Sequence, residues 1–266
     1  MLSNVFLKSL RDQRKPLLWW SIGLIAIAIF TMAFYPSIRD APGLDDMFEQ
    51  MPEVLRKVFL GAVADLTSPE GYLNSQLYVF FAPVLFLFFT IGRGSWAIAG
   101  EEQNGTLDLL LSYPVMRWRV VVDKFLAMTV ATLGLVMTLW LGTVAGIVMV
   151  GMEISLLRVA EVTLSAGLLG MAFGSLALAV GCATGKRSLS IGVASAVAVL
   201  AYFWNALAPS VDVLEPFRKV SPFYYYSGAD PLTNGLDPGH VAVLVGITVV
   251  LLALGIVAFR RRDLAV

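Results

Sequence analysis

The sequence predicts an all-α integral membrane protein with six transmembrane helices in one domain over residues 1–266. Its residues are 58% hydrophobic and only 14% charged, whereas a soluble domain has about 25% charged residues. Mean hydropathy is +0.79. The apolar residues lie in long runs, each close to the roughly 20 residues that a helix needs to cross about 30 Å of hydrocarbon. The runs are residues 17–35, 77–99, 125–150, 162–183, 189–208 and 241–259.

A basic segment, residues 2–15, precedes the first run and has the periodicity of an amphipathic helix. Because such helices lie in the headgroup layer, we predict a separate interfacial helix here; a charged flank that only fixes topology is the alternative. The following run, about 19 residues long, ends without a small-x-small cleavage site, so we interpret it as a retained span. The basic residues of the segment are Lys8, Arg11, Arg14 and Lys15.

The basic residues outside the spans are distributed unequally between the two sides of the membrane. Twelve lie on the side shared by both termini, and six lie on the other side. Short loops rich in Lys and Arg stay in the cytoplasm, so we predict an N-in/C-in topology. Residues 36–76 and 209–239 are then extracytoplasmic, and residues 100–124 form a cytoplasmic loop.

The second run carries one charge, Arg93, about two turns from its cytoplasmic end. An arginine at the centre of a bilayer costs roughly 2.5–3.5 kcal/mol on insertion scales, so its position needs an explanation. Two explanations remain open. The side chain can snorkel to the headgroups, or it can pair with Glu101 or Glu102 as part of a gate.

Small residues recur on one face of the fourth run at steps of three and four. Such a face lets another helix approach closely, which predicts a packing surface. A flexible helix beside a transport path is the alternative. The glycines of this face are Gly167, Gly170, Gly174 and Gly181.

One dense polar block, residues 100–124, separates the second and third runs. Asn104 can cap a short helix that begins at Gly105, and the leucines that follow give this helix one apolar face. Pro114 then interrupts the helical hydrogen bonds. We predict a short surface helix joined to two spans, so that a force applied to it would tilt both. An ordinary topology-setting loop is the alternative.

The chain lacks the residues that several classes of chemistry need. It has no GxxxxGK[ST] phosphate loop. With one histidine, His240, and one cysteine, Cys182, it offers no metal cluster and no His-dependent triad. Its zero net charge gives no reason to expect nucleic acid as a partner. We therefore predict no catalytic residues, metal or cofactor on this chain, and a function other than that of an enzyme.

The polar block resembles the signature of the type-2 ABC exporter permeases, the ABC-2 type. The similarity rests on Glu101-x-x-x-Gly105-Thr106-Leu107-x-x-Leu110-Leu111-Ser112-x-Pro114-x-x-Arg117, followed by Lys124. The six-span layout and the basic N-terminal segment are similar to that family, as are Ser221-Pro222-Phe223 and the stretch from Phe259 to Leu264. The resemblance covers the whole chain.

This resemblance implies a half-size permease that pairs with a second copy or a paralogue. Each first cytoplasmic loop of the pair would dock on a separate ATPase subunit, so that two ATPases carry the ATP and Mg. The segment 2–15 would be the connecting helix. The residues to which the resemblance assigns ATPase coupling are Glu101, Glu102, Gly105, Thr106, Leu107, Leu110, Leu111, Pro114 and Arg117.

The function predicted from the sequence is therefore that of a multi-pass exporter permease in the plasma membrane of a prokaryotic cell. An ATP-independent channel or carrier is the alternative, but it would need a polar stripe through the spans. A membrane-embedded protease that uses Glu101 and Glu102 is a further alternative, and it would require Arg and His residues on neighbouring helices. The cargo stays open among drugs, lipids, peptides and ions.

Overall fold

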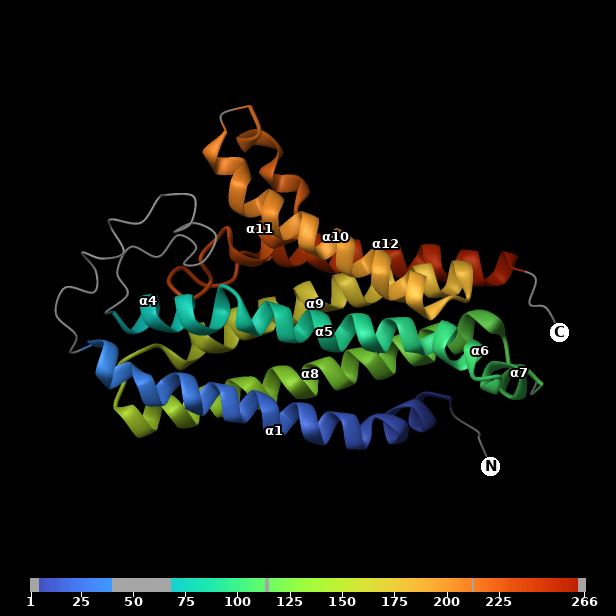
Figure 1. The fold of residues 1–266 in the computed structure, drawn as a ribbon, viewed down its shortest axis with the longest axis horizontal. Helices are drawn as coiled ribbons and strands as arrows, with labels where there is room; N and C mark the ends of the chain where they lie inside the picture. The colour runs from blue at the N-terminus through green and yellow to red at the C-terminus, as the bar shows by residue number, and fades with distance from the viewer. Residues whose placement is uncertain (1–4, 40–67, 113–114, 212, 263–266) are drawn as a thin grey trace.

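The computed structural model describes residues 5–39, 68–112, 115–211 and 213–262. These residues form an elongated bundle of long helices, most of which run close to its long axis (Figure 1). Six helices are long and apolar enough to cross a membrane, which confirms the predicted all-α membrane fold. They are α1 (Val5–Arg39), the composite helix Pro69–Gln103, α8 (Arg117–Val150), α9 (Leu156–Thr184), α10 (Arg187–Leu207) and α12 (Pro238–Arg261).

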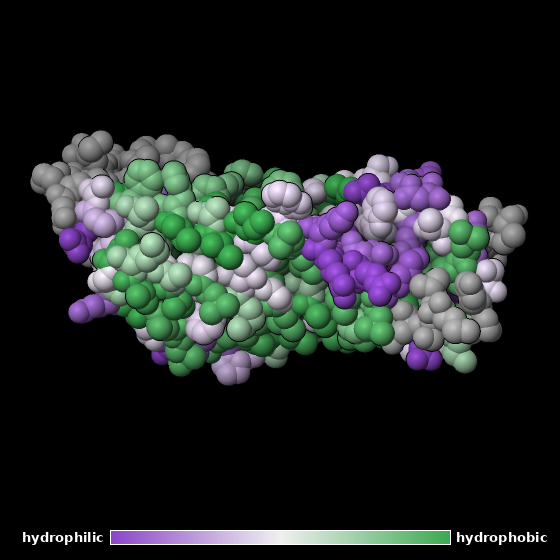
Figure 2. Space-filling model, turned by 90° about the horizontal axis from the view of Figure 1, so that it is seen from below, coloured by the Kyte–Doolittle hydropathy of each residue, from purple (hydrophilic) through white to green (hydrophobic). Residues whose placement is uncertain are grey.

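Helix α1 has no break, so the expected separation between an interfacial helix over 2–15 and the first span is wrong. Pro16 lies inside the helix. The reason is packing, because Val5, Ser9 and Gln13 recur every four residues and are all buried against the bundle. The opposite side of these turns forms a hydrophilic area at one end of an otherwise largely apolar face (Figure 2).

The second membrane helix is assembled from five segments, two of which are π-helical. It begins at Pro69 rather than at residue 77, because the Ser68 hydroxyl accepts a hydrogen bond of 3.1 Å from the Gly71 N–H and caps the first turn. Single π-helical turns within helices often mark functional positions. The segments are α4 (Pro69–Leu73), the π-helix η1 (Asn74–Tyr78), α5 (Phe81–Ser95), the π-helix η2 (Trp96–Gly100) and α6 (Glu101–Gln103).

Helix α9 is central and contacts α5, α8, α10 and α12. Its glycine face lies where α5 approaches most closely. A Cβ atom at Gly170 would lie 3.0 Å from Phe86 Cβ, and one at Gly174 would lie 2.8 Å from Thr90 Cβ. On the other side of the contact, a Cβ at Gly94 would lie 2.1 Å from the Gly174 carbonyl oxygen. The two backbones therefore nearly touch, and only glycine leaves room for this contact.

The other two glycines of this face meet different neighbours. A Cβ at Gly167 would lie 2.5 Å from Cγ2 of Val136 in α8, and one at Gly181 would lie 3.4 Å from Cβ of Ala99 in η2. The glycine face of α9 thus contacts both the second and the third membrane helices.

Gly174→Val is expected to lower the free energy of unfolding by about 1–3 kcal/mol, because the added methyl groups force α5 away from α9. Gly134→Val is the matched control, since Gly134 is exposed on α8 and a Cβ there meets nothing within 4 Å. Thermal denaturation of the two variants in the same detergent measures the difference. A Gly174→Val protein as stable as the control would contradict the close contact.

The predicted outer stretches are partly helical. Residues 40–67 of the first stretch, 36–76, lie outside the described residues. In the second stretch, 209–239, the short helices are η3 (Ala208–Ser210), η4 (Glu215–Val220) and α11 (Pro222–Ser227). The end of α10 and the short helices η3 and η4 project from the bundle (Figure 1), whereas Phe223 and Tyr226 of α11 are buried in its core. Trp204 Nε1 donates a hydrogen bond to the Phe217 carbonyl oxygen at 3.0 Å and helps to fix this projection.

Helix α12 begins three residues before the predicted run because Asp237 caps it. The Asp237 Oδ1 atom accepts hydrogen bonds from the N–H groups of Gly239 at 2.6 Å and His240 at 3.0 Å. The bonds from His240 and Gly239 favour the ionised carboxylate and hold the pKa of Asp237 below its ordinary value. The opposite end of α12 lies beside the polar block, where Arg262 pairs with Glu102.

Candidate functional site

The polar block folds into a sharp turn followed by a short helix, α7 (Thr106–Leu111). The chain leaves α6 through Asn104, and Gly105 then adopts a left-handed conformation with φ of 67°. Glycine adopts this conformation without the steric cost that a Cβ imposes. The Thr106 hydroxyl donates a hydrogen bond of 3.1 Å to the Glu101 carbonyl oxygen and closes the turn.

The helix start differs from the prediction that Asn104 would cap it. Gly105 is the residue before the first helical turn, and no side chain caps that turn. Asn104 instead ends α6, and its N–H donates to the Gly100 carbonyl oxygen at 3.2 Å, while the Gly105 N–H donates to the Glu102 carbonyl oxygen at 3.0 Å. The left-handed glycine lets the chain reverse so tightly that the Asn104 side chain takes no part in the helix.

The inner face of α7 is held by the bundle. Leu107 and Leu110 are buried, with 0% and 5% of their surface exposed. They belong to an apolar cluster that joins the second, third, fourth and sixth membrane helices to the start of α1. The other buried members of the cluster are Val5, Ile98, Val120, Val121, Leu178, Cys182 and Phe259. These two leucines therefore hold α7 to the membrane helices and do not face outward.

The outer face of α7 is open to solvent. Leu109 is 69% exposed, and Gly105, Thr106 and Asp108 beside it are exposed as well. An exposed leucine in the middle of a polar turn, next to a carboxylate, is a surface that a partner protein can cover. We call Gly105, Thr106, Asp108 and Leu109 the outer face of α7.

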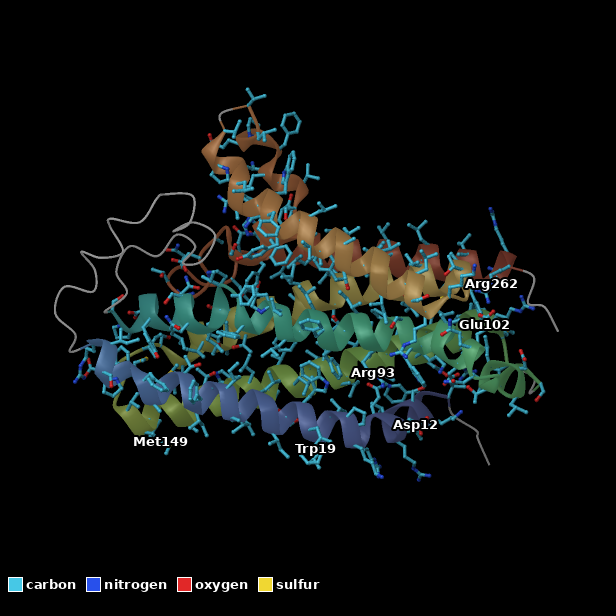
Figure 3. All side chains as sticks on the ribbon, viewed as in Figure 1. Asp12, Trp19, Arg93, Glu102, Met149 and Arg262 are labelled. Atoms are coloured by element: carbon cyan, nitrogen blue, oxygen red, sulfur yellow. The ribbon has the colours of Figure 1, made fainter. Side chains whose placement is uncertain are left out.

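Two ion pairs fix the turn to the rest of the protein. The Glu101 Oε1 atom lies 2.5 Å from Lys124 Nζ of α8, and both side chains are buried. Glu102 pairs with Arg262, which follows α12 (Figure 3). Arg117 Nη1 also donates a hydrogen bond of 2.9 Å to the Arg262 carbonyl oxygen. The turn is therefore connected to α8 and to the end of α12.

Arg262 also closes the end of α9. Its Nη1 atom donates a hydrogen bond of 3.1 Å to the Cys182 carbonyl oxygen, one of the last carbonyls of that helix. Carbonyl groups at a helix end have no partner within the helix, so a guanidinium there satisfies them. One side chain thus joins α6, α9 and α12.

Of the two explanations left open for Arg93, the pair with Glu101 or Glu102 does not form in the described residues, since the two glutamates pair with Lys124 and Arg262. Arg93 lies in α5, nearer to the middle of the bundle than Glu102 (Figure 3). Its Nε atom is buried and has no hydrogen-bond partner.

The remaining residues of the predicted coupling set have separate outcomes. Pro114 lies outside the described residues, and the side chain of Leu111 is likewise not described. In the described part of the chain, no group of three or more His, Cys, Asp or Glu side chains could hold a metal ion.

The sequence did not single out Arg262 as a partner of the polar block, because nothing in the spacing of residues indicates that the end of α12 returns to this turn.

One comparison decides the family of this molecule. The family model of the ABC-2 family transporter proteins matches residues 3–264, nearly the whole chain. The chain belongs to the ABC-2 transporter family. No curated protein matches the chain.

As a member of the ABC-2 family, the chain is the membrane permease of an ABC transporter and is not itself the catalytic subunit. The family implies partnership with an ABC ATPase. Six membrane helices and family membership together make it a multi-pass membrane protein.

Proposed function

We propose that this ABC-2 permease is an exporter subunit that receives work from a separate ATPase through the outer face of α7. The observation that carries the proposal is the division of α7 into two faces. Leu107 and Leu110 fix the helix to the bundle, while Leu109 and its polar neighbours stay exposed. A partner that pushes on this outer face moves the membrane helices with it, because buried contacts and ion pairs join them.

The partners in this proposal are those that the ABC-2 family implies. Two ABC ATPase subunits, which hold ATP and Mg, act on two permeases in one assembly in the plasma membrane of a prokaryotic cell. The second permease is a copy of this chain or a paralogue. Closure of the ATPases on ATP favours one arrangement of the two bundles and thereby opens a path to the outside.

The interior of one protomer supports a path between two protomers rather than through one. Several buried hydroxyl groups donate to carbonyl oxygens of their own helix, as Thr90 does at 2.8 Å, Thr132 at 2.9 Å and Thr163 at 2.6 Å. These three groups are already satisfied, and the buried hydroxyls without a partner in the described spans, those of Thr143 and Ser175, lie on two different helices and do not make a line of free polar groups for a cargo. An ATP-independent channel or carrier within one protomer is therefore the weaker proposal.

The test is MgATP hydrolysis by the complex that the tagged full chain brings with it from its own host. We expect an ABC ATPase subunit in equal number to the permease, and hydrolysis that vanadate inhibits. In liposomes, release of an exported fluorescent dye or lipid should require MgATP. Release that is equally fast without ATP, from a preparation that holds no ATPase, would favour the channel or carrier.

A further inference from the structure

A second polar site lies beside the turn that precedes α7, between α1, the second membrane helix and α8. It is a half-enclosed cavity of about 30 Å³, which is large enough for about two water molecules and is open on one side. Its polar lining comes from Ser9, Asp12, Gln13, Arg93, Glu101 and Lys124. It lies inside one protomer and does not include the outer face of α7.

Three buried polar atoms at this cavity have no hydrogen-bond partner. They are Nε of Arg93, Oε1 of Gln13 and Oε2 of Glu101. Gln13 is only 3% exposed and Glu101 only 9%. Nearly all buried polar groups in proteins find a partner, so three exceptions at one cavity call for a ligand. That ligand must accept one hydrogen bond and donate two.

The charges around the cavity favour an anionic group near Arg93. Lys124 pairs with Oε1 of Glu101, and Arg93 forms an ion pair neither with Glu101 nor with the exposed carboxylate of Asp12, although both lie near it. Arg187, which stacks on Trp96 at 4.8 Å, adds a further positive charge. The buried Nε–H of a half-buried guanidinium is costly to leave without a partner, and a phosphate is an anion that matches guanidinium geometry.

The cavity also lies at the depth of lipid headgroups. Helix α1 has 35 residues and is about 52 Å long, so it extends well beyond the roughly 30 Å of hydrocarbon. Asp12 and Gln13 precede the first uncharged run, and Trp19 nearby on the same helix is 71% exposed. Exposed tryptophan is typical of the membrane interface.

We propose that this cavity binds the headgroup of a phospholipid that carries a hydrogen-bond donor, such as phosphatidylethanolamine. The phosphate oxygen accepts from Arg93 Nε, and the ammonium group donates to Gln13 Oε1 and Glu101 Oε2. Phosphatidylcholine has the same phosphate but no N–H group, so it satisfies Arg93 alone. The bound headgroup would join α1 to the second membrane helix beside the turn, whether or not an ATPase docks there.

The experiment compares lipids on the full chain, purified in maltoside detergent and stripped of native lipid. Phosphatidylethanolamine is expected to raise the thermal midpoint by about 5 °C. Phosphatidylcholine should raise it by less than half as much, and inorganic phosphate should leave it unchanged. An equal effect of the two lipids would overturn the headgroup assignment. An equal effect of inorganic phosphate would replace the lipid by a free anion and overturn the proposal.

Substitutions place the effect at this cavity. Arg93→Gln should weaken the binding of phosphatidylethanolamine about tenfold or more, whereas Arg14→Gln, which removes an exposed cation of α1 that does not line the cavity, should not. Asp12→Asn should strengthen binding, because it removes the carboxylate that competes for Arg93. This second variant keeps the test decisive if Arg93→Gln fails to fold. The site would be overturned if binding is unchanged in Asp12→Asn and Arg93→Gln either binds as tightly as the original chain or fails to fold.

Discussion

Lys124→Met is expected to lower the free energy of unfolding by about 3–5 kcal/mol, because it leaves the Glu101 carboxylate buried without its partner. The ion pair has a nitrogen–oxygen distance of 2.5 Å, and the two side chains are only 7% and 11% exposed. Removal of one partner from such a pair costs more than removal of both. Denaturation of the purified protein in detergent, followed by tryptophan fluorescence, measures the loss.

Two further variants separate the ion pair from a general effect of substitution in α8. Arg119→Met removes an exposed cation of the same helix and should cost less than about 1 kcal/mol. The double variant Glu101→Gln with Lys124→Met should recover at least half of the lost stability, since neither charge then lies buried alone. A double variant as unstable as Lys124→Met alone would show that the pair is not the source of the effect.

Leu109→Asp is expected to reduce recovery of the ATPase with the permease at least tenfold while the permease itself stays folded. The side chain is 69% exposed, so the change costs the isolated permease little. Loss of a hot-spot contact at the centre of an interface costs about 2 kcal/mol or more, which corresponds to at least about tenfold in affinity. Quantitative co-purification, with the thermal midpoint of each permease variant measured in parallel, tests this.

Two comparisons make the Leu109→Asp result specific. Leu157→Asp changes a leucine that is 67% exposed at the start of α9, far from α7 along the bundle, and should leave ATPase recovery unchanged. Leu110→Asp buries a carboxylate in the apolar cluster and should destabilise the permease itself. Equal ATPase recovery from Leu109→Asp and Leu157→Asp would remove the outer face of α7 from the docking site.

The membrane helices could be predicted from the sequence because burial in lipid requires long uncharged runs, and such runs are visible in the composition. Their ends could not be predicted as well. Helix α1 continues through Lys15 and Pro16 because one side of its first turns is buried by the bundle, a contact that hydropathy does not reveal. Helix α8 likewise begins at Arg117, well before the uncharged run, since Lys124 finds an acidic partner.

The candidate site, like the helices, could be predicted only in part from the sequence. The apolar face of the short helix was visible in the spacing of Leu107 and Leu110, but the spacing did not say whether this face meets the bundle or a partner. The structure buries both, so we propose that the exposed Leu109, which the sequence had not singled out, contacts the ATPase instead. The partner of Glu102 was equally hidden, because Arg262 reaches it only through the fold of the whole chain.

Crosslinking from position 109 tests the central proposal most directly. Cys182 is the single cysteine and is buried, so Cys182→Ala with Leu109→Cys leaves one reactive thiol, on the outer face of α7. A photoreactive label on this thiol should crosslink the ABC ATPase in the intact complex, and the same label at Leu157→Cys should not. An intact complex in which position 109 fails to crosslink the ATPase, or in which position 157 crosslinks it equally well, would contradict docking on α7.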